Sequence, residues 1–146
     1  MKTKNIILSA LLSISFLPIS AQVSTTSPAK AGQGGGASAV ITKENGATVV
    51  NTTTLAEDVE GYAGPVPLKI FIKKDKVEKI EALQNMETPK YWALIKRDLL
   101  GKWNGLTTKK AATQQVDVIT GATYTSEAVI ENVRRGVEYY NKNGKK

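Results

Sequence analysis

Apolar residues recur at every second position from Leu68 to Ile72, which is the period of a β-strand with one buried face. Residues 74–76 are polar and are expected to turn the chain, and residues 77–83 are expected to run back as a partner strand. This pattern predicts an antiparallel hairpin.

A second hairpin is predicted upstream, within residues 39–50. Two β-rich runs there flank Asn45 and Gly46, a dipeptide that favours a tight two-residue turn. Between the two hairpins, residues 61–67 contain two glycines and two prolines, which are typical of a shaped loop rather than of the interior of an element.

The second half of the chain predicts two helices. The first begins at Thr88 and Pro89, because threonine can cap the free N–H groups of a helix and proline fits its first position. It is expected to end near Gly105. Apolar side chains at spacings of three, four and four residues form one face: Trp92, Ile95, Leu99 and Trp103. We expect both tryptophans to pack in the core.

The second predicted helix covers residues 126–141, with Thr125 or Ser126 as its cap. Charged side chains occupy the faces left for solvent, and the apolar face consists of Val129, Val133, Val137 and Tyr140. Together these elements predict an α+β fold in which a small antiparallel sheet is packed with helices.

The N-terminal region predicts export. Residues 1–21 combine Lys2 and Lys4, an apolar run and a small-residue ending, which is the pattern of a cleaved signal peptide. The run is shorter than the ~20 apolar residues that cross a bilayer; an uncleaved anchor is the alternative. Residues 22–38 are rich in small residues and predict a flexible linker. One domain, residues 39–146, is thus expected in the periplasm or envelope of a bacterium.

The composition narrows the possible chemistry. The chain has no cysteine and no histidine, which excludes thiolate metal sites and a cysteine nucleophile and removes the commonest general base. We therefore expect no metal site, and any chemistry is expected to come from a bound organic cofactor. The net charge is +7, but the lysines are scattered along the sequence. This favours a solvated basic surface over nucleic-acid binding.

Residues 117–126 carry the strongest chemical signal. Five hydroxyl side chains lie within residues 120–126, and Gly121 and Ala122 leave the backbone uncovered. The segment leads into a helix N-terminus, where free N–H groups and the helix dipole favour a phosphate. The alternative interpretation is ordinary helix capping by the hydroxyls.

The same segment resembles the flavinylation motif of FMN-binding domain proteins, Asp-x-x-Ser/Thr-Gly-Ala-Thr. The matching positions are Asp117, Thr120, Gly121, Ala122 and Thr123. In that family a flavin transferase moves the FMN half of FAD onto the last threonine, so the resemblance implies FMN joined covalently through its phosphate to Thr123. The family includes the C subunit of the sodium-pumping NADH:quinone oxidoreductase and the G subunit of the Rnf electron-transport complex.

Two further segments resemble the family in the same order. Residues 61–65 are similar to its glycine-tyrosine-glycine loop. Glu87, Thr88 and Pro89 resemble its Glu-Thr-Pro-Gly segment, although Lys90 stands in place of the glycine. The resemblance covers nearly the whole folded domain and implies that Glu87 and Thr88 lie near the isoalloxazine ring.

The resemblance implies an exported electron carrier that serves membrane or periplasmic redox proteins and has no evident turnover of its own. The expected cofactor-binding residues are Thr123, Asp117, Thr120, Gly121, Ala122, Thr125, Glu87 and Thr88. Asp117 is expected to shape the motif or help the transferase recognise it, and Thr120 to bond the phosphate or the loop backbone. Three alternatives stay open. The first is a detachable subunit that donates electrons to a specific exported reductase, and the second is an envelope binding module of the same fold that is never flavinylated. The third is attachment to a cell-wall polymer through the basic surface.

Overall fold

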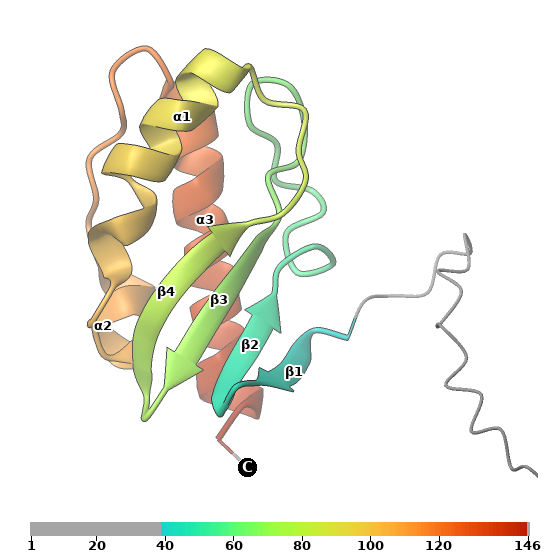
Figure 1. Cartoon of the computed structure of the whole chain (residues 1–146), viewed down its shortest axis with the longest axis vertical. Coiled ribbons are helices and arrows are strands. Elements are labelled where there is room, and N and C mark those ends of the chain that lie inside the picture. Colours follow the sequence, from blue (N-terminus) through green and yellow to red (C-terminus); the bar gives the residue numbers. More distant parts are fainter. Residues whose placement is uncertain (1–38, 146) are drawn as a thin grey trace, which may run out of the picture. The chain divides into compact units, whose positions relative to one another are not determined.

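The computed structural model describes residues 39–145, which contain four strands and three α-helices (Figure 1). The α+β class predicted from the sequence is confirmed. The predicted signal peptide, residues 1–21, and the linker, residues 22–38, lie outside the described residues. Within residues 39–145, no helix has the length and apolar character needed to cross a membrane.

The sheet is antiparallel, and its strands lie side by side in chain order: β1 (Ile41–Glu44), β2 (Ala47–Asn51), β3 (Leu68–Lys73) and β4 (Lys76–Ala82). Each strand pairs with its neighbour in the sequence, so both predicted hairpins are confirmed. The last strand begins at Lys76, one residue earlier than expected.

Two-residue turns with left-handed backbone close both hairpins. The φ angles are 49° at Asn45 and 79° at Gly46, and 51° at Lys74 and 58° at Asp75. Positive φ at both central residues matches the right-handed twist of the flanking strands. Asparagine and glycine adopt this conformation readily, whereas lysine is less suited to it. The β3–β4 turn therefore depends on further contacts, which Asp75 supplies to two helices.

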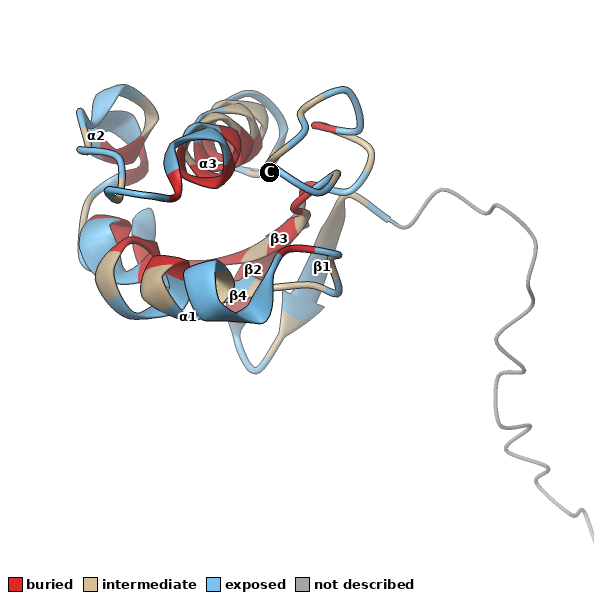
Figure 2. Cartoon of the chain, turned by 90° about the horizontal axis from the view of Figure 1, so that it is seen from above, coloured by how far each residue is buried: buried red, intermediate tan, exposed pale blue. Residues whose placement is uncertain are grey.

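The main core lies between the sheet and α3 (Thr123–Asn143), which packs along one face of the sheet (Figure 2). The alternating residues of β3 belong to this core, with no more than 1% exposure: Leu68, Ile70 and Ile72. The predicted apolar face of α3 is buried in the same core: Val129, Val133, Val137 and Tyr140. Two separate sequence patterns thus identified the two halves of one core.

A smaller cluster lies apart from the main core and explains why Phe71 is buried at a position between the core residues of β3. Phe71 is 7% exposed and packs with Ala47 and Val49. The ammonium nitrogen of Lys79 lies 4.4 Å from the centroid of the Phe71 ring. The aliphatic stem of a lysine can cover apolar surface while its charge stays in water.

The first predicted helix is shorter than expected. α1 (Pro89–Asp98) is followed by a 3₁₀ turn, η1 (Leu100–Trp103). Gly101, a poor helix former, lies in this turn. Beyond it, the N–H of Gly105 donates to the carbonyl of Val77 at 2.7 Å and brings the chain back to β4. The prediction of one α-helix reaching Gly105 is therefore wrong, because beyond Leu99 the chain continues only as a 3₁₀ turn that ends at Trp103.

The apolar face predicted for this helix nevertheless packs on the core. Ile95, Leu99 and Trp103 are no more than 1% exposed, and Trp92 is partly buried against them. Both tryptophans therefore pack as expected, and η1 shortens the helix without exposing its apolar side chains.

A short helix, α2 (Thr108–Thr113), was not expected from the sequence. It has only six residues, too few to display helical periodicity. The hydroxyl of Thr107 accepts from the N–H of Lys110 and caps it. The helix packs on α3 through Ala111, which is 3% exposed. Tertiary packing rather than local pattern holds this helix in place.

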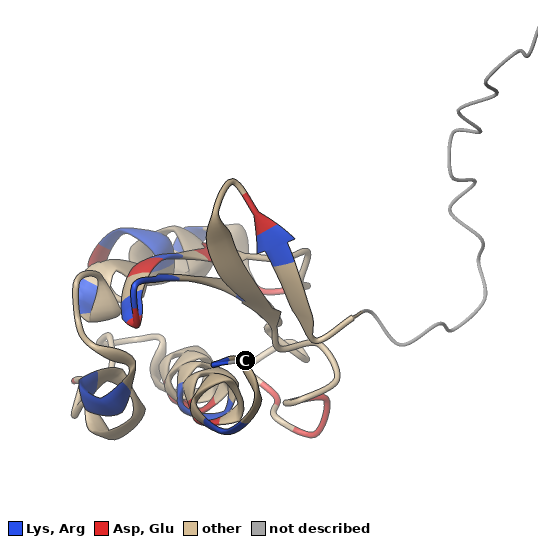
Figure 3. Ribbon diagram, turned by 90° about the horizontal axis from the view of Figure 1, so that it is seen from below, with Lys and Arg blue, Asp and Glu red and all other residues tan. Residues whose placement is uncertain are grey.

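The charged residues of α3 that the sequence left for solvent (Figure 3) form a network of ion pairs, which the sequence analysis did not predict. Arg134 bonds Glu131 and Glu138, and Arg135 bonds Glu131 and Asp58. The hydrogen bonds from Arg134 and then Arg135 hold the pKa of Glu131 below its usual range. The pair between Arg135 and Asp58 also links α3 to the loop that follows β2.

Gly136→Ala is expected to destabilise the domain by about 1–3 kcal/mol. A Cβ atom at Gly136 would lie 2.6 Å from Cδ1 of Ile70 and 3.0 Å from Cγ2 of Thr52, where α3 approaches the sheet closely. Urea unfolding monitored by circular dichroism measures the loss. Gly101→Ala is the matched control, because the nearest atom there, on Asn104, is 3.9 Å away. Equal stability of the two variants would contradict the close approach.

Candidate functional site

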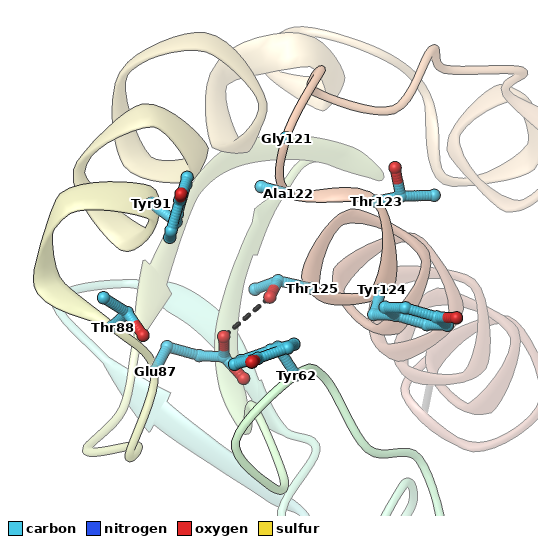
Figure 4. Close-up of a pocket in the computed structure, with 9 residues that line it drawn as sticks. All are labelled: Tyr62, Glu87, Thr88, Tyr91, Gly121, Ala122, Thr123, Tyr124 and Thr125. Atoms are coloured by element: carbon cyan, nitrogen blue, oxygen red, sulfur yellow. Dashed lines mark hydrogen bonds between the residues drawn. The ribbon is translucent and has the colours of Figure 1, made fainter.

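A pocket of about 280 Å³ lies where the starts of α1 and α3 meet the loop between β2 and β3 (Figure 4). All three segments that resemble family motifs contribute to its wall, although they are far apart in the sequence. The lining residues are Tyr62, Glu87, Thr88, Tyr91, Gly121, Ala122, Thr123, Tyr124 and Thr125. Six of the eight residues expected to bind a cofactor are among them.

Hydrogen bonds to Ser126 position the loop that precedes α3. The Ser126 hydroxyl accepts from the N–H of Ile119 at 2.9 Å and donates to the carbonyl of Ala122 at 2.8 Å. Gly121, with φ of 84°, makes the left-handed bend between them. Ala122 is the residue that precedes the helix, so the expectation that Thr125 or Ser126 caps α3 is wrong. Their side chains are used in tertiary contacts instead.

The N-terminus of α3 is open to a ligand. The helix begins at Thr123, Ala122 makes no side-chain cap, and the first turn has no acidic residue. The first N–H groups of a helix have no partner within the helix, and their partial positive charge favours an anion. Thr123 is exposed, and its hydroxyl points away from Thr125 and Glu87 at the rim of the pocket (Figure 4).

The carboxylate of Glu87 fastens the floor of the pocket. Glu87 is only 7% exposed. Its Oε2 accepts from the hydroxyl of Thr125 at 2.6 Å, and its Oε1 accepts from the N–H of Ala63 at 3.0 Å. A Cβ atom on Gly61 would lie 2.5 Å from Oε1, so a side chain there would push the carboxylate out of its hydrogen-bonded position. Glu87 therefore holds the loop that carries Tyr62 against α3.

Three tyrosines contribute to the lining of the pocket. Tyr62 comes from the loop before β3, Tyr91 from α1 and Tyr124 from α3, with exposed fractions of 75%, 40% and 68%. The sequence analysis did not identify them as a set. Tyr91 follows Thr88 by three residues and thus lies on the same side of α1, a signal that could have found it.

The hydroxyl of Thr88 does not cap α1, contrary to the expectation from the sequence. Thr88 stands at the position before the helix, and its carbonyl accepts from the N–H of Trp92 at 2.9 Å. Its side chain makes no capping hydrogen bond and lines the pocket instead. The side chain of Thr88 therefore forms part of the pocket wall and does not cap the helix.

Asp117 and Thr120 are exposed and do not line the pocket. Asp117 lies in a different, shallow groove together with Asp98 and Lys102. Thr120 lies in the loop immediately before Gly121. Over residues 39–145, the structure contains no group of three or more acidic residues placed to hold a metal ion.

Comparison with known proteins agrees with this geometry. The FMN-binding domain matches the chain over residues 61–138, more than half of its 146 residues. The matched range includes every residue that lines the pocket. Comparisons with curated proteins and with solved structures gave no match.

Glu87→Ala is expected to release the loop that carries Ala63 and to destabilise the domain by about 1–3 kcal/mol, because the buried Thr125 hydroxyl loses its acceptor. Hydrogen exchange of the Ala63 amide, followed by NMR, should become about tenfold faster. Glu127→Ala removes an exposed carboxylate from α3 and should leave that rate unchanged. An unchanged Ala63 rate in Glu87→Ala would show that the loop does not depend on this contact.

Proposed function

The chain belongs to the FMN-binding domain family, and on this premise we propose that it is an exported electron carrier with FMN bonded through its phosphate to the hydroxyl of Thr123. The position of Thr123 carries the proposal. Its exposed hydroxyl belongs to the first residue of α3, at the rim of the pocket in which all three family-like segments meet.

The residues present fit a flavin nucleotide. Tyr62, Tyr91 and Tyr124 offer aromatic surface to a planar ring system. The uncapped start of α3 offers N–H groups and the helix dipole to a phosphate. Gly121 has no side chain that would cover the backbone between these two parts of the site.

The attachment is a phosphoryl transfer with FAD as the donor. The hydroxyl oxygen of Thr123 bonds to the phosphorus of the FMN half, the bond to the AMP phosphate breaks, and AMP and the hydroxyl proton leave. Glu87 is not a suitable base for this proton, because its two oxygens already accept from Ala63 and Thr125. Activation is therefore assigned to a flavin transferase with bound magnesium.

FMN, when bound, accepts and passes on electrons singly or in pairs. The chain's own residues hold and orient it: Thr123 tethers the phosphate, and Thr88 and Tyr91 line the side formed by α1. Tyr62 and Tyr124 are the most exposed lining tyrosines, at 75% and 68%. This open side of the pocket suits exchange of electrons with periplasmic redox proteins, or with the parts of membrane redox proteins that extend into the periplasm.

A covalent bond suits an exported carrier. Outside the cytoplasm there is no free FMN pool to replace a lost cofactor, so a flavin held only by equilibrium binding would be lost by mass action. Asp117 and Thr120 are exposed in the loop that precedes the attachment site in the sequence. We assign them to recognition by the transferase rather than to contact with the flavin.

Thr123→Ala is expected to abolish the yellow-green fluorescence that a flavinylated chain keeps through a denaturing gel, because the acceptor oxygen is absent. The chain is co-expressed with a flavin transferase for this measurement. Thr113→Ala, at an exposed position on α2 outside both the pocket and the motif, should keep the signal. A fluorescent Thr123→Ala band would place the attachment elsewhere.

The intact mass of the chain, purified from its native envelope, is expected to show two changes. Removal of residues 1–21 would report cleavage of the signal peptide, and the added mass of FMN less one water would report the phosphodiester. A matured chain without flavin, in a host that contains the transferase, would instead identify a binding module of this fold.

A further inference from the structure

One end of the domain gathers lysines from three segments that are distant in the sequence (Figure 3). The β3–β4 turn, α2 and the end of α3 meet there around Asp75. Its carbonyl accepts from the N–H of Thr108 at 2.9 Å, and its carboxylate accepts from the hydroxyl of Tyr140 at 3.0 Å. These segments contribute six exposed lysines, here called the basic end: Lys73, Lys74, Lys76, Lys109, Lys110 and Lys142.

A hollow of about 380 Å³ opens in the basic end beside the β1–β2 turn, and four lysines contribute to its lining: Lys43, Lys73, Lys74 and Lys145. Two of the nearby carboxylates are already engaged, and a third, Glu78, is exposed near the β1–β2 turn. Asp75 accepts from Tyr140 and pairs with Lys145 at 3.6 Å, and Glu44 pairs with Lys69 at 2.8 Å. Most of the positive charge at this end is therefore left for an external partner.

The pocket lies at the other end of the domain, where the starts of α1 and α3 meet the loop that carries Tyr62. The 21 residues of α3 separate the two ends, and at ~1.5 Å per residue they span about 30 Å. Lysines that are scattered along the sequence are thus concentrated in space, at the end of the domain opposite the pocket.

We propose that the basic end docks on an anionic phospholipid surface and holds the pocket facing away from the membrane. Lysines are compact, hydrated charges on flexible stems, which suit a layer of mobile headgroups better than one ligand of fixed geometry. A cluster of about four to eight such residues is typical of attraction to anionic lipid.

The placement of the lysines distinguishes this surface from two other partners. A linear polyanion is bound along a groove or stripe of charge, whereas these lysines surround one end of the domain. A redox protein must reach the pocket, and the basic end lies the length of α3 away from it. The part of the proposal that concerns the orientation of the pocket rests on the proposed function. The docking itself depends on the lysines and does not require a flavin.

Co-sedimentation with vesicles tests the proposal. The full chain is expected to bind vesicles that contain phosphatidylglycerol more tightly than vesicles of phosphatidylcholine alone. Raising the salt from about 0.05 M to about 0.5 M should abolish the difference, because salt screens exposed charges. Equal binding to both kinds of vesicle at low salt would overturn the proposal. Residues 1–38 are common to every variant, so comparison between variants isolates the basic end.

Lys73→Gln/Lys109→Gln/Lys110→Gln is expected to weaken binding to the anionic vesicles about 10- to 100-fold. The matched control, Lys90→Gln/Lys96→Gln/Lys102→Gln, removes the same charge from exposed positions on α1 and η1 and should bind within about twofold of the parent chain. Equal losses in the two variants would overturn the proposal, because net charge alone would then explain binding.

Two further measurements complete the test. Binding of the parent chain to a soluble cell-wall polyanion but not to anionic vesicles would overturn the proposal in favour of the polymer. Thr123→Ala should bind vesicles as the parent does, so that failure of flavin attachment and failure of docking are distinguishable.

Discussion

The buried carboxylate of Glu87 joins the three segments from which the pocket is built. One oxygen accepts from the loop before β3, through the N–H of Ala63, and the other accepts from the first turn of α3, through Thr125. A buried carboxylate is costly unless hydrogen bonds satisfy it, so alternative arrangements that break either contact are unfavourable. Gly61 must also lack a side chain for the carboxylate to fit. The shape of the pocket is therefore set by a buried contact rather than by free loops.

Three hydroxyl side chains of the site do not cap the helices beside which they lie. Thr88, Thr125 and Ser126 have side chains that commonly cap helices, yet each has another role here. Thr88 lines the pocket, Thr125 donates to Glu87, and Ser126 fastens the loop before the helix. The N-terminus of α3 is left without a side-chain cap. This free helix end, next to the exposed Thr123, is the physical basis for proposing a phosphate at that position.

The proposed flavin site and the proposed docking surface lie at opposite ends of α3. The pocket lies at the start of α3, and Lys142 lies in its last turn. Separation of the two leaves the open side of the pocket accessible while the other end is held. Asp75 has a structural role at the basic end, because its contacts with α2 and Tyr140 hold the lysine-bearing segments together.

Local sequence patterns by themselves determined several strands, turns and helix faces of this protein. The period of β3, the Asn45–Gly46 turn and the apolar face of α3 depend on neighbouring residues, and the motif-like segments identified Glu87, Thr88 and Thr123, which line the pocket. Only the tertiary structure decided where α1 ends, that α2 exists, and that α3 begins at Thr123. It also decided that Thr125 bonds Glu87, 38 positions away, and that the lysines share one end. These features depend on contacts between distant residues, which no local pattern encodes.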